Sequence, residues 1–412
     1  KSGLKMEVIR HGKYKSAVEP FLENKMSDAN KEQTMALLNG IWTNIVEDIS
    51  KSRNIPVEKL NTIANGLLAR TPEMAKAQKL IDYIAYEDVY HNAIRKVLKV
   101  DKDEDYNTVS IADYTQKTTT TSVNMDSNDA IAIVYAQGEI GSGEGDVNEI
   151  GEGSMRRSLQ EARKDDDIKA IVLRINSPGG SALTSDLIWR EIELTKRVKP
   201  VVVSMGNYAA SGGYYIACNA NTIFAEKNTI TGSIGVFGTL PNFSVAANRY
   251  GINTEQVRTH ENASNYSPFV PMDEKFKAIT LEGVENIYAT FIGHVAEGRK
   301  MTTAQVDAIG QGRVWTGSEA VKIGLVDKIG GLREAIAEAA KLAKIKSYST
   351  VNYPEYEKNF EDIFANFPFA KSKMAFIKEE IGEENYQLLQ EIKRIKQRKG
   401  IQAIMPFEIS IQ

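Results

Sequence analysis

The chain has 412 residues, of which 42% are hydrophobic and 25% charged, which is ordinary for a globular protein of two or three domains. Its formal net charge of −3 gives no sign of a nucleic-acid partner or of binding to an anionic membrane surface. The single cysteine, Cys218, excludes a disulfide scaffold, and no run of 18 or more apolar residues predicts a membrane span. The start lacks a signal peptide and a helix cap, so we expect a fragment or a processed chain.

Two stretches of the chain repeat one another at a fixed offset. Residues 3–21 align without a gap on residues 251–269, and helical patterns follow both stretches. Residues 63–82 then mirror residues 309–327. The identical pairs at the offset of 248 are Gly3 with Gly251, Glu7 with Glu255, Arg10 with Arg258, Ser16 with Ser264, and Pro20-Phe21 with Pro268-Phe269. We expect two tandem copies of one unit, the first present only as its C-terminal half; the alternative is a chance likeness of two helical hairpins.

This alignment divides the chain into four segments. Residues 1–100 are the C-terminal half of the first copy, and residues 130–345 are the second copy. The polar, Thr-rich stretch 101–129 between them is typical of a linker. Residues 346–412 form a tail unlike either copy, with an amphipathic helical pattern, a basic run and a strand-like end.

Strand and helix patterns alternate in the second copy. Short apolar runs predict strands at residues 130–136, 170–175, 200–204 and 222–225, and 3–4 residue spacing predicts helices at 154–163, 182–197 and 212–220. Near-continuous apolar strands that alternate with helices predict a buried parallel sheet and an α/β fold. Reactive loops of such sheets lie at the carboxyl ends of strands, where this chain carries NSPGG, AASGG and TGSIG.

Ser211 of AASGG is the candidate nucleophile. It lies after a predicted strand and opens a predicted helix, whose free N–H groups and dipole favour negative charge. The N–H of Gly212 would help to hold the oxyanion as the serine attacks a carbonyl. The alternative is an ordinary N-cap serine.

The NSPGG turn offers a second oxyanion donor from Gly179 or Gly180. A phosphate cradle is a competing use of such a turn, but neither the Walker spacing nor G-x-G-x-x-G is present. A plain tight turn remains the other alternative.

The general base has two kinds of candidate. The histidines are His11, His91, His260 and His294, and only His11 lies near a candidate motif. A lysine serves as a base where burial keeps it neutral, and Lys15 lies in HGKYKSAVEPF, with Ala263 as its counterpart in the second copy. The residues alone leave open that Lys15 is a solvated surface lysine.

Several strings together resemble one known family. YKSAVEPF, RINSPGGSA, SMGNYAASGGYYIA, TGSIGVFG and GRVWTGSEAVKIGLVD are similar to signal peptide peptidase A in its long, duplicated bacterial form. The resemblance covers residues 3–345 and leaves the tail uncovered. It implies that Ser211 is the nucleophile, that Lys15 is the base, supplied by the first copy, and that Ser233 hydrogen-bonds the lysine. Gly212 and a glycine of NSPGG would form the oxyanion hole.

The resemblance also implies a fold and a setting. The fold would be like that of Clp proteases and crotonases, with repeated strand-strand-helix units. The substrates would be remnant signal peptides and other short apolar segments, cleaved without ATP, metal or cofactor. The family forms homo-oligomers, here expected to be a tetramer. An N-terminal anchor, absent from this chain, would hold it to the bacterial inner membrane, facing the periplasm or the exterior.

Two rival functions and one hypothesis about the tail remain. A crotonase-type acyl-CoA enzyme would share the glycine turn but would use carboxylates, which the three loops lack. A non-catalytic scaffold would carry the Ser–Lys pair incidentally. The alternating residues 405–411 would add to a neighbour's sheet edge, lie in the substrate groove, or form an ordinary edge strand.

Overall fold

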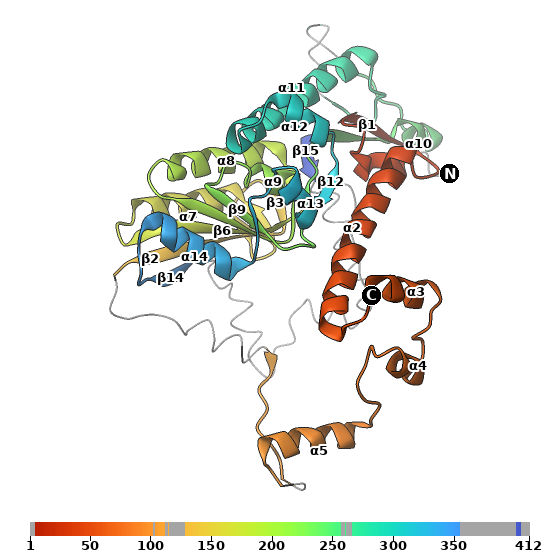
Figure 1. Cartoon of the computed structure of the whole chain (residues 1–412). Coiled ribbons are helices and arrows are strands. Elements are labelled where there is room, and N and C mark those ends of the chain that lie inside the picture. The colour runs from red at the N-terminus through yellow and green to blue at the C-terminus, as the bar shows by residue number, and fades with distance from the viewer. Residues whose placement is uncertain are drawn as a thin grey trace, which may run out of the picture. The chain divides into compact units, whose positions relative to one another are not determined.

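The computed structural model describes residues 5–101, 104–111, 114, 128–256, 260, 266–354 and 401–404. The chain forms two compact units (Figure 1). Unit 1 comprises Lys1–Leu37 and Asp126–Gln412, and unit 2 comprises Leu38–Met125. The boundaries predicted at residues 100, 129 and 345 separate the two copies of the repeat from the linker and the tail. The division into compact units does not test them, so they stay predictions.

The larger sheet of unit 1 is predominantly parallel, which confirms the α/β class expected from the apolar strands. Its main path runs β12 (Val314–Thr316), β10 (Ile230–Gly232), β8 (Val201–Ala210), β6 (Ile168–Ser177), β2 (Ala130–Gln137) and β14 (Ser349–Tyr353). β9 (Thr222–Ala225) adds to β8, and β13 (Lys328–Ile329) adds to β9. Along this path only the β10–β12 pair is antiparallel within the described residues.

Helices cover both faces of this sheet because alternate residues of each buried strand point to opposite faces. On β2 and β6, Ile131 and Val172 pack against the alanines of α14 (Leu332–Ala343). Ala132 and Leu173, one residue further along, belong to the core on the other face. That face carries α7 (Glu152–Lys164), α8 (Ala182–Lys196), α9 (Gly212–Tyr215) and α11 (Glu274–Arg299) (Figure 1).

The predicted helix at residues 212–220 is shorter than expected. Only Gly212–Tyr215 is α-helical, and the residues that follow form turns. The chain enters β9 at Thr222, and the residue before it is held beside β8 because the N–H of Asn221 donates to the carbonyl of Val201 at 2.8 Å. The connection into the sheet therefore limits the length of this helix.

A second sheet of seven strands joins the two ends of the chain. Its order is β1 (Lys5–His11), β11 (Val236–Asn242), β15 (Ile401–Ile404), β7 (Gly179–Ser181), β3 (Glu139–Gly141), β5 (Glu149–Gly151) and β4 (Gly145–Asp146). β1 and β11 are antiparallel, with His11 opposite Val236. The segment after β1 therefore lies beside the segment before β11, although more than 200 residues separate them in sequence.

Further helices complete unit 1. They are η1 (Ser16–Val18), α1 (Glu19–Leu22), the part of α2 (Asp28–Arg53) up to Leu37, α10 (Ser244–Arg249), α12 (Thr303–Ile309) and α13 (Gly317–Lys322). Among the described residues, no helix is both long and apolar enough to cross a bilayer.

Unit 2 is helical in its described part. The rest of α2 is followed by α3 (Val57–Asn65), α4 (Pro72–Ala77) and α5 (Glu87–Leu98). Its small core consists of Val46, Ile55 and Leu60. The predicted linker lies largely outside the described residues, and so do the amphipathic and basic parts of the tail, in residues 355–400.

Candidate active site

Ser211 lies at the junction of β8 and α9 with an unusual backbone. Its φ of 55° and ψ of −115° are rare for a non-glycine residue, and such strain costs on the order of 1–3 kcal/mol. Two hydrogen bonds hold it: the Ser211 N–H donates to the carbonyl of Gly232, and the Tyr215 N–H donates to the carbonyl of Ser211, both at 2.8 Å. Strain that persists at a fully buried serine indicates a functional position.

Lys15 meets Ser211 and Ser233 inside the protein. Its Nζ lies 2.9 Å from Ser211 Oγ, 3.0 Å from Ser233 Oγ and 3.2 Å from the Ser233 carbonyl oxygen. All three residues are 0% exposed. The structure thus brings together three residues that the sequence singled out, from segments about 200 residues apart.

Burial sets the protonation of Lys15. Desolvation holds the pKa of Lys15 well below its ordinary value of 10.5, and no ion pair to it exists in the described part of the chain. A neutral amine has two N–H donors and one lone pair. In the neutral form, donation to the two Ser233 oxygens would leave the lone pair for the Ser211 hydroxyl, which is the arrangement that a general base requires.

Glycines form the walls around the lysine. A Cβ on Gly312, whose φ is +81°, would lie 2.7 Å from the backbone nitrogen of Lys15. A Cβ on Gly235 would lie 3.3 Å from Lys15 Cδ. The Tyr14 N–H also donates to the carbonyl of Gln311 at 2.8 Å. Residues 311–312 therefore pack closely on the loop that carries Lys15, and the sequence analysis did not identify them.

The predicted oxyanion donors border the nucleophile. Gly212 is the first residue of α9, so its N–H belongs to the helix-terminal donors without an intrahelical partner. A Cβ on Gly213 would lie 2.7 Å from the Ser177 carbonyl oxygen, so the NSPGG turn packs directly on α9. The Gly179 N–H donates to Ser177 Oγ at 3.1 Å. The choice between Gly179 and Gly180 as second donor stays a prediction.

A strand of the tail lies beside this turn. β15 pairs antiparallel with β7 on one side and with β11 on the other, placing Ile404 opposite Gly179 and Ala403 opposite Gly180. The strand predicted at residues 405–411 lies outside the described residues, and the described strand ends just before it.

The histidine candidates have other partners. His11 lies 2.7 Å from a carboxylate oxygen of Glu285 and stacks on Tyr288. His294 stacks on Trp189, and its Nε2 lies 3.1 Å from Asp186 Oδ1. Among the described residues, no group of three or more His, Cys, Asp or Glu side chains has the arrangement of a metal site.

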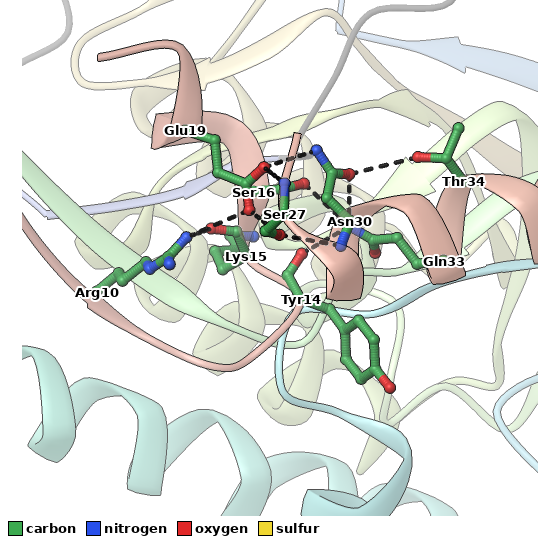
Figure 2. Close-up of polar contacts among 9 residues, drawn as sticks. All are labelled: Arg10, Tyr14, Lys15, Ser16, Glu19, Ser27, Asn30, Gln33 and Thr34. Carbon is green, nitrogen blue, oxygen red and sulfur yellow. Dashed lines mark hydrogen bonds and ion pairs between the residues drawn. The ribbon is translucent and has the colours of Figure 1, made fainter. Parts of the chain in front are cut away.

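Polar side chains also contact the loop that carries Lys15. Figure 2 shows Gln33 of α2 beside Tyr14 and Ser16, and Arg10 and Glu19 beside Lys15. Glu19 lies within the string YKSAVEPF, whereas Gln33 lies in no motif. Only the structure reveals the contacts of Gln33.

The sequence is similar to those of several known proteins. The sequence matches peptidase family S49 over residues 1–101 and 193–346. It is 37% identical to Protease 4 of Salmonella typhi over 357 residues, which are 84% of this chain and 57% of that protein. It is 36% identical to Protease 4 of Haemophilus influenzae, with the same two shares. It is 34% identical to a chloroplastic serine protease SPPA of Arabidopsis thaliana, over 84% of this chain and 52% of that protein.

The chain thus spans little more than half the length of these relatives. The family match covers more than half of the chain, including Lys15 and Ser211. The chain belongs to peptidase family S49.

Proposed function

We propose that the protein is a serine peptidase in which Ser211 is the nucleophile and Lys15 is the general base. The observation that carries this proposal is the 2.9 Å contact between Lys15 Nζ and Ser211 Oγ in a fully buried site. Burial supplies the second requirement, because it lowers the pKa of Lys15 and favours the neutral amine.

The reaction follows from this geometry. Lys15 Nζ takes the proton of Ser211 Oγ as the oxygen attacks the peptide carbonyl. The N–H of Gly212, with a glycine of the NSPGG turn, donates to the oxyanion, and each such donor is worth about 3 kcal/mol. Lys15 gives its proton to the leaving amine and then takes one from the water that hydrolyses the acyl-enzyme. The two oxygens of Ser233 hold the ammonium while Lys15 is charged.

The substrates that we propose are remnant signal peptides and other short apolar segments. The resemblance to signal peptide peptidase A supports this class. The antiparallel strands around β15 support an extended binding mode, because the backbone edges of β7 and β11 accept a chain largely independently of its side chains. The fold that we propose is of the Clp protease and crotonase kind, and neither ATP, metal nor cofactor takes part in the steps above.

Hydrolysis of a fluorogenic apolar peptide between pH 6 and pH 10 tests the proposal. The wild type should gain activity with pH through one ionisation, and both Ser211→Ala and Lys15→Ala should abolish turnover. Activity in Lys15→Ala would refute the base, and activity in Ser211→Ala would refute the peptidase itself. Coenzyme A thioesters serve as the control substrate, since a crotonase-type enzyme would bind them.

We also infer that the chain holds two related copies. α2 and α11 each have 26 residues. Arg53 near the end of α2 pairs with Asp82, and Arg299 at the end of α11 pairs with Asp327. The same relative positions and partners support a duplication over the described helices.

Assembly and location rest on the resemblance. We propose a homo-oligomer, a tetramer, attached to the bacterial inner membrane, with the site facing the periplasm or exterior. Exposed apolar side chains in unit 2 support self-association, among them Leu38, Trp42, Leu67 and Val97. Light scattering after size-exclusion chromatography should give about four times the mass of one chain, and a monomer at all concentrations would refute the assembly.

A further inference from the structure

Gln33 clamps the backbone on both sides of the proposed base. Its Nε2 donates to the Tyr14 carbonyl oxygen at 2.8 Å and to Ser16 Oγ at 2.9 Å, with a longer contact of 3.3 Å to Asn30 Oδ1 (Figure 2). Tyr14 and Ser16 are the immediate neighbours of Lys15 in the chain. Gln33 itself is 0% exposed. One amide group therefore fixes the loop on either side of the lysine.

The other end of the same amide is left unsatisfied. Gln33 Oε1 is buried and has no hydrogen-bond partner among the described residues. An orphaned buried acceptor costs on the order of 1–3 kcal/mol. A glutamine at this position therefore costs stability at its oxygen. What it provides in return is the pair of hydrogen bonds to Tyr14 and Ser16.

A second group of polar side chains contacts the same loop. Arg10 Nη1 donates to the Lys15 carbonyl oxygen at 3.2 Å and lies 3.8 Å from the Glu19 carboxylate. Ser27 and Asn30 donate to Glu19. Burial raises the pKa of Glu19, but these hydrogen bonds and the charge of Arg10 outweigh burial and hold the pKa below its ordinary value. The carboxylate stays charged and keeps Arg10 in place.

We propose that Gln33 is a positioning residue for Lys15, a role that rests on the proposed function of Lys15 as the base. It keeps Nζ within 3 Å of the Ser211 hydroxyl and keeps water away from the amine. A misplacement of about 1 Å in an active site can cost on the order of a hundredfold in rate. A loosened loop would also admit water and return the pKa of Lys15 toward its ordinary value.

The test is Gln33→Met in the full chain, because methionine keeps the length and removes both donors. We expect kcat to fall tenfold to a hundredfold, KM to change less than twofold, and the midpoint of the pH–rate profile to move upward. The matched control is Gln160→Met, since Gln160 also donates from a helix of unit 1, but to Glu191 and not to the lysine loop. It should leave kcat and the midpoint unchanged.

Three results would overturn the role: an unchanged kcat and midpoint, a loss confined to KM, or an equal loss in Gln160→Met. If Gln33→Met does not fold, Ser16→Ala removes one of the two bonds and should move kcat and the midpoint in the same direction by less. An unmoved midpoint in Ser16→Ala would then count against the clamp. Failure of the proposed function is distinguishable, because it would appear as activity in Lys15→Ala.

Discussion

The buried amine of Lys15 makes a prediction about stability that is independent of catalysis. The perturbation is Lys15→Met, which keeps a long, unbranched side chain and removes the ionisable group. Because burial lowers the pKa of Lys15 below 10.5 in the folded state, the unfolded chain binds a proton that the folded chain does not, at every pH between these two values. Wild-type stability therefore rises with pH across this window, and it is fully developed only above 10.5.

The size of the effect follows from linkage. One proton taken up on unfolding changes the free energy of unfolding by about 1.4 kcal/mol per pH unit. Lys15→Met lacks this pH dependence. The difference in free energy of unfolding between wild type and variant should therefore grow by up to about 1.4 kcal/mol per pH unit as the pH rises from the lowered pKa of Lys15 to 10.5. The variant also loses contacts to Ser211 and Ser233, but that loss is the same at each pH and cancels from the slope.

The assay is guanidinium unfolding of both proteins at pH 7, 8, 9 and 10. Lys13→Met is the matched control, because the Lys13 side chain is 62% exposed. Its stability should run parallel to that of the wild type. Parallel curves for Lys15→Met would refute the reasoning, since they would mean that Lys15 keeps its proton in the folded protein and cannot act as a base.

Three further substitutions have direct outcomes. Ser233→Ala removes one of the two Ser233 oxygens at Lys15 Nζ, which is worth about 1 kcal/mol, so kcat should fall roughly fivefold at constant KM in steady-state peptide hydrolysis. Gly180→Ala would place a Cβ 2.1 Å from the Ile140 carbonyl oxygen, so thermal unfolding should occur at a lower temperature and activity should be lost; a wild-type melting curve would contradict this packing. Ile171→Ala empties a fully buried core position and should cost about 2–5 kcal/mol in urea unfolding, with a smaller loss counting against the core assignment.

The parallel sheet was predictable because its strands are buried on both faces. Helices pack on both faces of the sheet, so apolar side chains are needed on both faces of each strand. The buried strands β6 and β8 therefore appear in the sequence as largely apolar runs. The positions of the glycine-rich loops were predictable for the same reason, since they follow these runs. The short helix after Ser211 was not, because its length is set by the connection into β9 rather than by its own residues.

The environment of Lys15 could not be read from the residues around it. HGKYKSAVEPF is polar, and nothing local distinguishes a buried lysine from a solvated one. Its burial results from the antiparallel pairing of β1 with β11, a long-range contact that leaves no local pattern. The role proposed for Gln33 and the place of β15 likewise depend on which segments meet. The proposal that Lys15 is the base therefore came from the resemblance to a family and not from the sequence pattern.

Placement and activation of the proposed base depend on the same long-range contacts. The pairing of β1 with β11 brings the loop of Lys15 toward Ser233, and Gly235, which lies close to Lys15 Cδ, helps to enclose the buried side chain. If β1 left the sheet, Lys15 would lose its contact with Ser211 and regain its charge together, since solvent would restore the ammonium. A displaced lysine is thus also an inactive one. The chain therefore needs no separate carboxylate to tune the base, and within the described residues Lys15 has no ion pair.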